Sequence, residues 1–395
     1  MASPKLRFKE FDGDWCISPL KNLCKINQGL QIAIEERFLE DAENRFFYIT
    51  NEFLRDGAKK SYFIENPPIS VRCKSEDILM TRTGNTGQVV TNVEGAFHNN
   101  FFKIDFDRKQ IDKNFFVEFL RKNTTQHLIL KYAGASTIPD LNHSDFYRIQ
   151  MPITSIDEQT KIASFLSAVD EKISQLTQKH ELLSQYKQGM MQKLFSQEIR
   201  FKADDGSEFG EWENTVIGDI ADIVGGGTPS TNNEAYWSGD VVWLTPSEIN
   251  QKFIGESKRT ISELGVQKSS AKKLPIGTIL FTSRATIGEV AIAIAEVTTN
   301  QGFQSFISNE KTFNEFLYYW IVNNKKSFIE RASGSTFLEI SKSKIQPMEI
   351  SLPCIEEQTK IANFLSAIDQ KIEDVAQQIE QAKTWKKGLL QQMFV

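Results

Sequence analysis

The feature that most constrains this chain is an internal repeat with an offset of 199 residues. The segment Glu158–Ala163 reads EQTKIA, and the same letters return at Glu357–Ala362. The match continues through shared FLSA and DxKI motifs, and at the far end Tyr186–Phe195 resembles Trp385–Phe394. Because the alignment needs no gap, each copy is expected to form one continuous structural element.

Both copies have the apolar spacing of a coiled-coil helix, with steps of three and four residues. The predicted seam consists of Leu166, Val169, Ile173, Leu176 and Leu183 in the first copy, and of Leu365, Ile368, Ile372, Val375 and Ile379 in the second. Lys187 and Lys386 interrupt this pattern. Each helix is expected to begin near Asp157 or Glu356, because acidic side chains favour the positive end of the helix dipole. The helices most simply pair antiparallel, as a spacer rod of roughly 60 Å.

A weaker repeat precedes each helix, so the chain reads domain, helix, domain, helix. Leu6–Lys9 resembles Ile199–Lys202, and Ile78–Thr81 resembles Ile279–Thr282. The predicted segments are a first domain at 1–150, a helix at 151–198, a second domain at 199–350 and a helix at 351–395. The predicted fold class is α+β, with two mixed α/β domains separated by two long antiparallel coiled-coil helices in a pseudo-twofold repeat. Alternating apolar residues at 290–295 predict one of the strands.

Polar, glycine-containing loops interrupt the expected strands of both domains. Arg82–Gly87 reads RTGNTG, and Gly225–Asn233 reads GGGTPSTNN. Binding residues tend to lie on such loops when a rigid scaffold holds them. Asn, Ser, Thr and Arg carry the donors and acceptors that match base edges and phosphates. Ordinary turn chemistry is the alternative explanation for many of these Asn and Gly residues.

The domain–helix order, the paired EQTKIAxFLSAxDxKI segments and the stretch Ser238–Ile249 (SGDVVWLTPSEI) resemble the specificity subunits of type I restriction–modification enzymes. The resemblance covers essentially the whole chain. It implies two target-recognition domains that each read one half of a bipartite, asymmetric DNA site. It also implies that the repeated helices dock two modification subunits, which methylate adenine, and that restriction subunits join for cleavage. S-adenosylmethionine, ATP and Mg are then expected on the partner subunits, and no cofactor on this chain.

The resemblance supplies the candidate loops of the second domain, and the polar Arg82 to Thr86 loop is chosen in the first domain. The candidates for DNA contact are Arg82, Thr83, Asn85 and Thr86 in the first domain, and Thr228, Ser230, Thr231, Asn232, Asn233, Ser283, Arg284 and Thr286 in the second. The first domain departs from the family's glycine-rich loop, because it has Asn27–Leu30 at that place. The lysines that could line a duplex are Lys59, Lys60, Lys268, Lys272 and Lys273, with a solvated surface as the equal alternative. The candidates for docking partner subunits are Glu158, Gln159, Lys161, Glu357, Gln358 and Lys360.

Composition weighs mildly against DNA binding by the chain alone. The net charge is −5, whereas a free DNA-binding domain often has a strong basic excess. We therefore expect weak DNA binding by the isolated chain and a contribution from the modification subunits. Four scattered cysteines predict reduced thiols and no zinc site. The sequence shows no signal peptide and no transmembrane run, which predicts a cytoplasmic protein.

Motifs that look catalytic are incomplete. Asn66–Ile69 (NPPI) lacks the aromatic residue with which adenine methyltransferases stack a flipped base. The nuclease-like combination of Asp140 with Asp170 and Lys172 is explained by a solvated helix face. Gly225–Gly227 lacks the lysine and hydroxyl residue of a phosphate-binding loop. The sequence therefore predicts a recognition subunit without catalysis. The alternative is a coiled-coil scaffold that presents two protein-binding domains and does not touch DNA.

Overall fold

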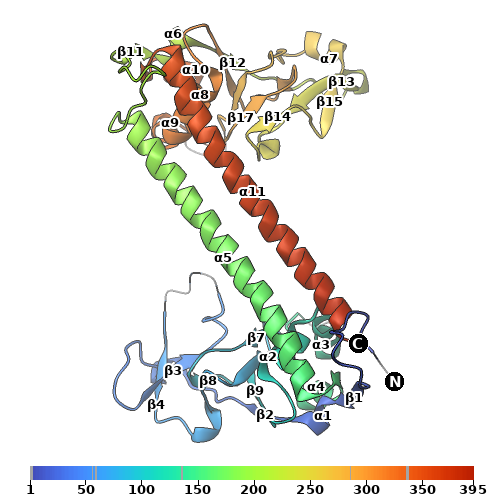
Figure 1. Cartoon of the computed structure of the whole chain (residues 1–395). Coiled ribbons are helices and arrows are strands. Elements are labelled where there is room, and N and C mark those ends of the chain that lie inside the picture. Colours follow the sequence, from blue (N-terminus) through green and yellow to red (C-terminus); the bar gives the residue numbers. More distant parts are fainter. Residues whose placement is uncertain (1–2, 56, 58–59, 135–136, 285, 335–337) are drawn as a thin grey trace. The chain divides into compact units, whose positions relative to one another are not determined.

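The computed structural model describes residues 3–55, 57, 60–134, 137–284, 286–334 and 338–395. The chain divides into two compact units, the first made of residues 1–177 and 377–395 and the second of residues 178–376. The division passes through both long helices, α5 (Ile156–Phe195) and α11 (Ile355–Met393), so each helix contributes one part to each unit (Figure 1). Both helices begin within a residue of the predicted starts.

The first unit combines two sheets and a strand pair with short helices (Figure 1). One sheet has the order β2-β9-β6-β7, the other has the order β4-β3-β8-β5, and β1 pairs with β10. The strands are β1 (Cys16–Pro19), β2 (Cys24–Gln28), β3 (Arg45–Ile49), β4 (Phe63–Glu65), β5 (Arg72–Cys73), β6 (Ile78–Thr81), β7 (Val89–Val90), β8 (Gly95–Phe97), β9 (Phe101–Phe106) and β10 (Gln150–Ile153). The helices are α1 (Leu20–Leu23), η1 (Ile34–Glu36), η2 (Ile69–Val71), α2 (Lys113–Arg121), α3 (Asn123–Ala133) and α4 (His143–Tyr147).

The second unit repeats this plan. One sheet has the order β12-β19-β16-β17-β14, the other has the order β15-β13-β18, and β11 pairs with β20. The strands are β11 (Glu213–Val216), β12 (Ala221–Gly225), β13 (Trp237–Leu244), β14 (Phe253–Ile254), β15 (Arg259–Ile261), β16 (Ile279–Phe281), β17 (Val290–Ala293), β18 (Thr298–Thr299), β19 (Gln304–Ser308) and β20 (Glu349–Leu352). The helices are α6 (Ile217–Ile220), η3 (Glu234–Tyr236), η4 (Pro246–Glu248), α7 (Glu263–Gln267), α8 (Asn314–Asn323), α9 (Lys325–Arg331) and α10 (Lys342–Ile345). The strand expected at 290–295 is confirmed.

The first strand pair of the main sheet has a matching antiparallel register in the two units. In the first, Gln28 at the end of β2 pairs with Phe102, and in the second Gly225 at the end of β12 pairs with Gln304. The next strand of each sheet, β6 or β16, adds to β9 or β19 in the same antiparallel sense. The predicted fold class, two mixed α/β domains with two long helices in an internal repeat, is confirmed.

Each unit packs its sheet and helices around one main apolar core. In the first unit that core includes Trp15, Phe102 and Phe115, together with Leu166 of α5 and Met393 of α11. Burying a side chain of this size contributes roughly 1.5–3 kcal/mol. The corresponding core of the second unit includes Trp212, Phe306 and Phe316, with Leu365 of α11 and Leu194 of α5. Because the start of one long helix and the end of the other meet in each core, the helix segments run antiparallel within each unit.

The predicted seam is largely buried. Seven of its members have less than a tenth of their surface exposed: Leu166, Val169, Leu176, Leu365, Ile368, Val375 and Ile379. Ile173, Leu183 and Ile372 are half-buried. If the three-and-four spacing of the seam is continued past Lys187, it leads to Met190, but the structure buries Met191 and leaves Met190 half-buried. The buried position therefore moves by one residue at this end of the helix, because Met191 and Leu194 pack into the core of the second unit.

The two lysines that interrupt the heptads are paired with aspartates on the opposite helix. Lys386 Nζ lies 2.7 Å from Asp170 in the first unit, and Lys187 Nζ lies 2.5 Å from Asp369 in the second. The Lys187–Asp369 pair is mostly buried, whereas the Lys386–Asp170 pair keeps Asp170 nearly half exposed. No helix in the described part of the chain is long and apolar enough to cross a membrane.

Candidate nucleic-acid interface

Three polar loops of the second unit meet at one edge of its main sheet. The loop after β12 joins the loop before β19 through a hydrogen bond from Gly227 N to Thr299 O (2.8 Å). The loop after β16 joins the same segment through Ser283 N and Gly302 O (2.7 Å). The Thr228 hydroxyl donates to the side-chain oxygen of Gln301. Thr228 and the Ser283 loop, predicted separately, are therefore held together by residues 299–302.

Gly226, at the start of the loop after β12, has no room for a side chain. A Cβ on Gly226 would lie 2.0 Å from Asn300 O and 2.5 Å from Thr299 O. In the first unit a Cβ on Gly29 would lie 2.2 Å from Phe97 O and 2.3 Å from His98 O. Gly29 thus takes the place of Gly226, although the loop around it lacks the other glycines. Both glycines let two backbones approach where a side chain would separate them.

The first unit brings the same three loops together with different side chains. Leu30 N donates to Phe97 O (3.0 Å), and Arg82 N donates to Asn100 O (2.7 Å). The side chain of Gln28 donates to Asn99 O (3.3 Å), and that of Asn99 donates to Gln31 (3.0 Å). These bonds match those of the second unit in position, so the framework is shared. The side chains that this framework carries differ between the two units.

Several of these polar residues were not among the sequence candidates. They are Gln28, Gln31, Asn99, Asn300 and Gln301. Asn and Gln side chains can form paired hydrogen bonds with adenine in the major groove. The signal that could have found them is the short polar run between two apolar strands, HNN at residues 98–100 and NQG at residues 300–302.

Both candidate arginines are engaged by carboxylates. Arg82 binds Asp140 through two bonds, Nε to Oδ1 at 3.1 Å and Nη2 to Oδ2 at 2.7 Å. Arg284 Nε lies 2.8 Å from Glu339. Burial alone would raise the pKa of the Asp140 carboxyl, but hydrogen bonds from Thr83 and Arg82 outweigh it and hold that pKa below its ordinary value. Thr83 and Asn85 are accessible on the same loop.

Two predicted contact residues are internal, which corrects their assignment. The Thr86 hydroxyl is buried and donates to Arg82 O (3.0 Å) and Pro139 O (2.6 Å). Ser283 is fully buried between the loop before β19 and Ile340, whose N–H donates to Ser283 O at 3.0 Å. A duplex on the surface therefore reaches neither hydroxyl, and both residues shape the loop that carries the arginine. Thr286, beside them, is exposed.

The remaining candidates of the second unit lie on exposed turns. Ser230, Thr231, Asn232 and Asn233 form the turn before η3, where the indole of Trp237 donates to Ser230 O (3.1 Å). Lys268 and Lys272 are exposed on either side of Ser270–Ala271, the segment against which Gly227 packs. These residues therefore border the loops that carry Thr228. Lys273 forms ion pairs with Glu263 and Glu296 instead.

The lysine pair predicted in the first unit is less informative. Lys59 lies outside the described residues. Lys60 is exposed on the segment that leads into β4. Within the described part of the chain, no hydrogen bond or ion pair joins Lys60 to the Arg82 loop. The link from that segment to the loop is Asn51, whose amide donates to Thr83 O (3.0 Å).

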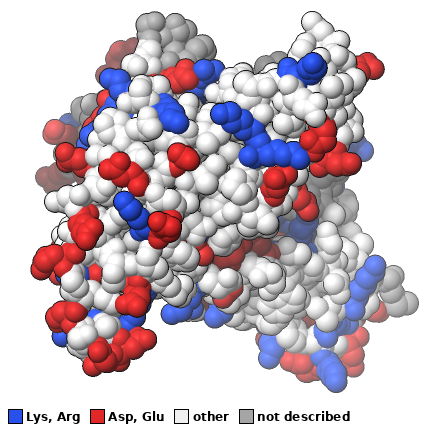
Figure 2. Space-filling model, turned by 90° about the horizontal axis from the view of Figure 1, so that it is seen from above, with Lys and Arg blue, Asp and Glu red and all other residues white. Residues whose placement is uncertain are grey.

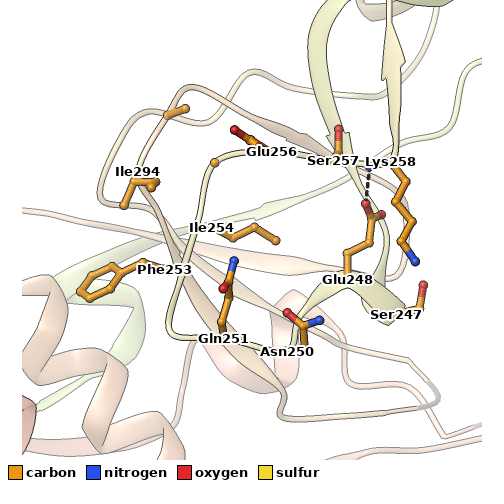
Figure 3. Close-up of a pocket in the computed structure, with 12 residues that line it drawn as sticks. Ser247, Glu248, Asn250, Gln251, Phe253, Ile254, Glu256, Ser257, Lys258 and Ile294 are labelled. Carbon is orange, nitrogen blue, oxygen red and sulfur yellow. Dashed lines mark hydrogen bonds between the residues drawn. The ribbon is translucent and has the colours of Figure 1, made fainter. Parts of the chain in front are cut away.

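A pocket of about 640 Å³ opens in the second unit between the turn after η4 and the loop after β17 (Figure 3). Asn250, Gln251 and Phe253 line one side, and Ile294 lies opposite. Pro246, which precedes the pocket residue Ser247 in η4, lies against Gly302 of the loop before β19. The pocket therefore adds amide and aromatic side chains next to the candidate interface.

Four residues predicted to dock partner subunits are buried, which overturns their assignment. Glu158 and Glu357 are at most 1% exposed and bind arginines of their own units, Arg7 at 2.7 Å and Arg200 at 2.8 Å. Burial alone would raise the pKa of Glu158, but the hydrogen bonds from Arg7 and Thr154 lower it below the ordinary value. Both glutamates therefore fasten the segment before each domain onto its helix.

The neighbouring glutamines are internal clamps. Gln159 accepts from Asp112 N (3.0 Å) and donates to Gln110 O (2.9 Å) and Thr154 O (2.8 Å). Gln358 makes the corresponding bonds to Phe313 N (2.8 Å), Lys311 O (3.0 Å) and Pro353 O (2.9 Å). The repeated EQ dipeptide therefore attaches each helix to its own domain and is not available to a partner.

The surface beside these clamps is apolar and aromatic in both units. Lys161 and Lys360 keep part of their side chains exposed; Lys161 lies over the Phe8 ring, and Lys360 pairs with Asp204. We define an aromatic patch in each unit. The patch of the first unit consists of Phe8 and Trp385, whose rings both contact Phe165, and of the exposed Leu6. For the second unit we take the Phe201 and Phe364 rings, which contact each other, together with the exposed Ile199 and Tyr186, the repeat counterparts of Leu6 and Trp385. Trp385 and Tyr186, repeat counterparts, are each about half exposed.

The nuclease-like carboxylates do not form a group. Asp140 binds Arg82, whereas Asp170 binds Lys386 on the coiled coil. Among the described residues, no three His, Cys, Asp or Glu side chains are grouped so that they could hold a metal ion. The four cysteines are free.

Comparison with known proteins identifies the repeat. The family described as type I restriction modification DNA specificity domain matches residues 12–185 and again residues 210–384. The MjaIX specificity subunit of Methanocaldococcus jannaschii is 41% identical over 192 residues, a stretch that takes up 47% of this chain and only 44% of that protein. The MjaVIII specificity subunit of the same organism is 25% identical over 97% of this chain and 94% of its own length.

The solved structure of the type I restriction–modification S subunit from M. genitalium has the same fold. Its TM-score is 0.61 at 18% identity, and the superposition covers 100% of this chain and 99% of that one. The two family matches fall on the two halves of the internal repeat, and each begins close to the tryptophan, Trp15 or Trp212, that packs in its unit's core. The chain therefore belongs to the type I restriction–modification DNA specificity family, whose domain it contains twice.

Proposed function

We propose that this chain is the DNA-reading subunit of a type I restriction–modification complex, and that each unit reads one half of a bipartite site. The observation that supports this most strongly is a shared loop framework with different polar side chains. Gln28, Gln31 and Asn99 stand in the first unit where the second has Gly225, Thr228 and Gln301. Different side chains in equivalent places read different base edges. The two half-sites should therefore differ, and the full site should be asymmetric.

The charge of this chain supports DNA binding in which the modification subunits also take part. On the face drawn in Figure 2, Lys and Arg side chains lie among Asp and Glu and do not form one continuous basic field. Phosphate neutralisation supplies most non-specific affinity, and this chain has a net charge of −5. We infer that modification subunits supply much of the phosphate contact, while this chain supplies base recognition.

The aromatic patches are the proposed docking sites for those subunits. Aromatic side chains concentrate binding energy at protein interfaces. Two patches built from repeat-related residues, one centred on Trp385 and one on Tyr186, suit two copies of one partner. S-adenosylmethionine, ATP and Mg would be bound by the partners, and this chain would direct methylation and cleavage without catalysing either. Since its partners act on intracellular DNA, we place it in the cytoplasm.

The alternative of a scaffold without a DNA role is not favoured by the double family match. The test is methylome sequencing of a host that expresses this chain with its modification subunit, against a host that expresses the modification subunit alone. We expect a split, asymmetric motif with methyladenine in each half only when this chain is present. Exchange of residues 199–350 for those of another specificity subunit should change one half only. Absence of any motif from an assembled complex would contradict the proposal.

A further inference from the structure

An exposed carboxylate lies directly on the candidate interface of each unit, where DNA phosphates would repel it. Asp140 keeps nearly half of its side chain exposed, and Glu339 keeps 39%. Both belong to the segment that leads into the short helix α4 or α10. Their only ion-pair partners among the described residues are Arg82 and Arg284, the two arginines of the recognition loops.

The ion pair is present in both units although the arginine has changed position. Thr81 and Thr282 are equivalent, because each hydroxyl donates to the carbonyl four residues later in the same turn. Arg82 follows Thr81 directly, whereas Arg284 comes two residues after Thr282. In each unit the acid forms a backbone bridge to the second loop residue, Thr83 with Asp140 and Arg284 with Glu339. The pairing has thus been kept through a change of sequence register, while the neighbouring amide side chains have diverged.

In each ion pair the acid is bonded to guanidinium N–H groups with which an arginine could otherwise bind DNA. Asp140 occupies the Nε–Nη2 edge of the Arg82 guanidinium at 3.1 and 2.7 Å, one of the edges with which an arginine forms a forked contact to guanine or a phosphate. A duplex must therefore replace the carboxylate to engage this edge of the arginine, and in the second unit Glu339 holds the Nε of Arg284 in the same way. On a wrong sequence the replacement bonds are incomplete, and the released carboxylate is left unpaired next to phosphates.

We infer that Asp140 and Glu339 are specificity-determining residues, each of which withholds the paired N–H groups of its arginine from DNA until the matching half-site replaces the carboxylate. This inference rests on the proposed function. It assigns to the acids a selective role against non-target DNA, which a purely structural ion pair would lack. The acids lower affinity for every duplex, but they lower it more for duplexes that cannot complete the arginine contacts.

The test uses the complex of the full chain with its modification subunit. Fluorescence anisotropy would measure the binding of a duplex with the methylated motif and of duplexes with one half-site scrambled, over a range of salt concentrations. The variants are Asp140→Asn and Glu339→Gln, which keep shape and a hydrogen-bond acceptor. We expect affinity for scrambled DNA to rise on the order of tenfold, with a much smaller change for the target. The salt dependence on scrambled DNA should steepen by about one phosphate contact for each variant.

Each variant should relax recognition of the half-site read by its own unit, so scrambling the other half-site is an internal control. Glu380→Gln removes the same charge from an exposed pair with Lys383 on α11, and should leave the ratio of target to scrambled affinity unchanged. Unchanged affinity for scrambled DNA in Asp140→Asn and Glu339→Gln would overturn the inference. So would weaker target binding without a gain on scrambled DNA, since the acids would then only orient the arginines. If the wild-type complex itself did not prefer the target, the proposed function would fail instead.

Discussion

Lys187 Nζ lies 2.5 Å from Asp369 Oδ1, and the same pairing recurs between their repeat counterparts Lys386 and Asp170. Each pair crosses between the long helices inside one unit. In the second unit the Tyr319 hydroxyl also donates to Asp369 (2.5 Å), and in the first unit Glu118 contacts Lys386 from the place that Tyr319 occupies. The two lysines that interrupt the heptads therefore make polar contacts between the helices, and these contacts fix the helix register.

Removing one of these lysines should destabilise the chain. Lys187→Met leaves the Asp369 carboxylate, which is 27% exposed, with Tyr319 as its only hydrogen-bond partner among the described side chains, and this should cost roughly 1–3 kcal/mol of unfolding free energy. Chemical denaturation of the full chain measures this. Lys383→Met removes an exposed pair with Glu380 and should change stability by less than about 0.5 kcal/mol. Equal losses for both variants would contradict the assignment.

Substitution of a glutamine clamp should lower the free energy of unfolding more than substitution of an exposed glutamine. Gln159→Leu and Gln358→Leu each remove three hydrogen bonds to backbone groups and should each cost about 2–4 kcal/mol. Gln175→Leu, on the exposed face of the same helix α5, should stay within about 0.5 kcal/mol. Thermal unfolding of the three variants under one set of conditions makes the comparison, and a Gln175→Leu loss as large as the others would count against internal clamps.

Docking of the first segment onto α5 should be sensitive to acid. The pKa of Glu158 is lowered in the folded state, so its contribution is present above the unfolded pKa, ordinarily about 4.3, and is lost as the pH falls through the folded value. The stability difference between wild type and Glu158→Gln should therefore be constant near neutral pH and shrink below about pH 4. Denaturation over this pH range tests it. In an Arg7→Gln background the difference should lose most of its pH dependence, because Arg7 is the main partner.

Base recognition should divide between the units. Asn99→Ala should weaken discrimination at one half-site and Gln301→Ala at the other, each by about 1–3 kcal/mol, because each amide belongs to the loop framework of its own unit. Competition binding with duplexes altered in a single half-site separates the two effects. Lys326→Ala changes an exposed side chain on α9 and should weaken neither half. A uniform loss over all duplexes in the amide variants would indicate phosphate contact instead.

The aromatic patches should control assembly. Trp385→Ala and Tyr186→Ala each truncate the exposed centre of one patch and should weaken binding of one modification subunit by roughly 2 kcal/mol. Sedimentation or mass photometry should then show complexes with a single modification subunit, and the double variant should show none at matched concentration. Leu182→Ala, exposed on α5, is the control and should assemble normally.

The sequence predicted the elements with strong periodicity and missed the contacts made over long distances. The helix starts and most of the seam followed from local spacing. The EQ dipeptides were assigned to partner docking from the resemblance to the family, whereas their partners within the chain, Arg7 and Gln110, lie far away in the sequence. The repeated arginines in LRFK and IRFK carried the missing signal, since each matches the charge of its glutamate.

The candidate interface shows the same division. The loops that carry Arg82, Arg284 and Thr228 could be recognised from the sequence, because glycine-rich polar turns are visible locally, and their contact with DNA stays a prediction. The acids that hold the arginines, and the amides brought beside Thr228 by strand pairing, depend on contacts between distant segments. The burial of Thr86 and Ser283 likewise follows from a neighbouring segment packing over their loop.

The division of the helices between two units has a consequence for the order of folding. Residues 178–376 form one contiguous stretch, so the second unit can close its core from neighbouring chain. The first unit needs Leu389, Met393 and Phe394 in its core, more than two hundred residues after its own strands. During synthesis its apolar surface around Trp15 and Phe115 must wait for the last helix, which favours contact with chaperones or partner subunits at that stage.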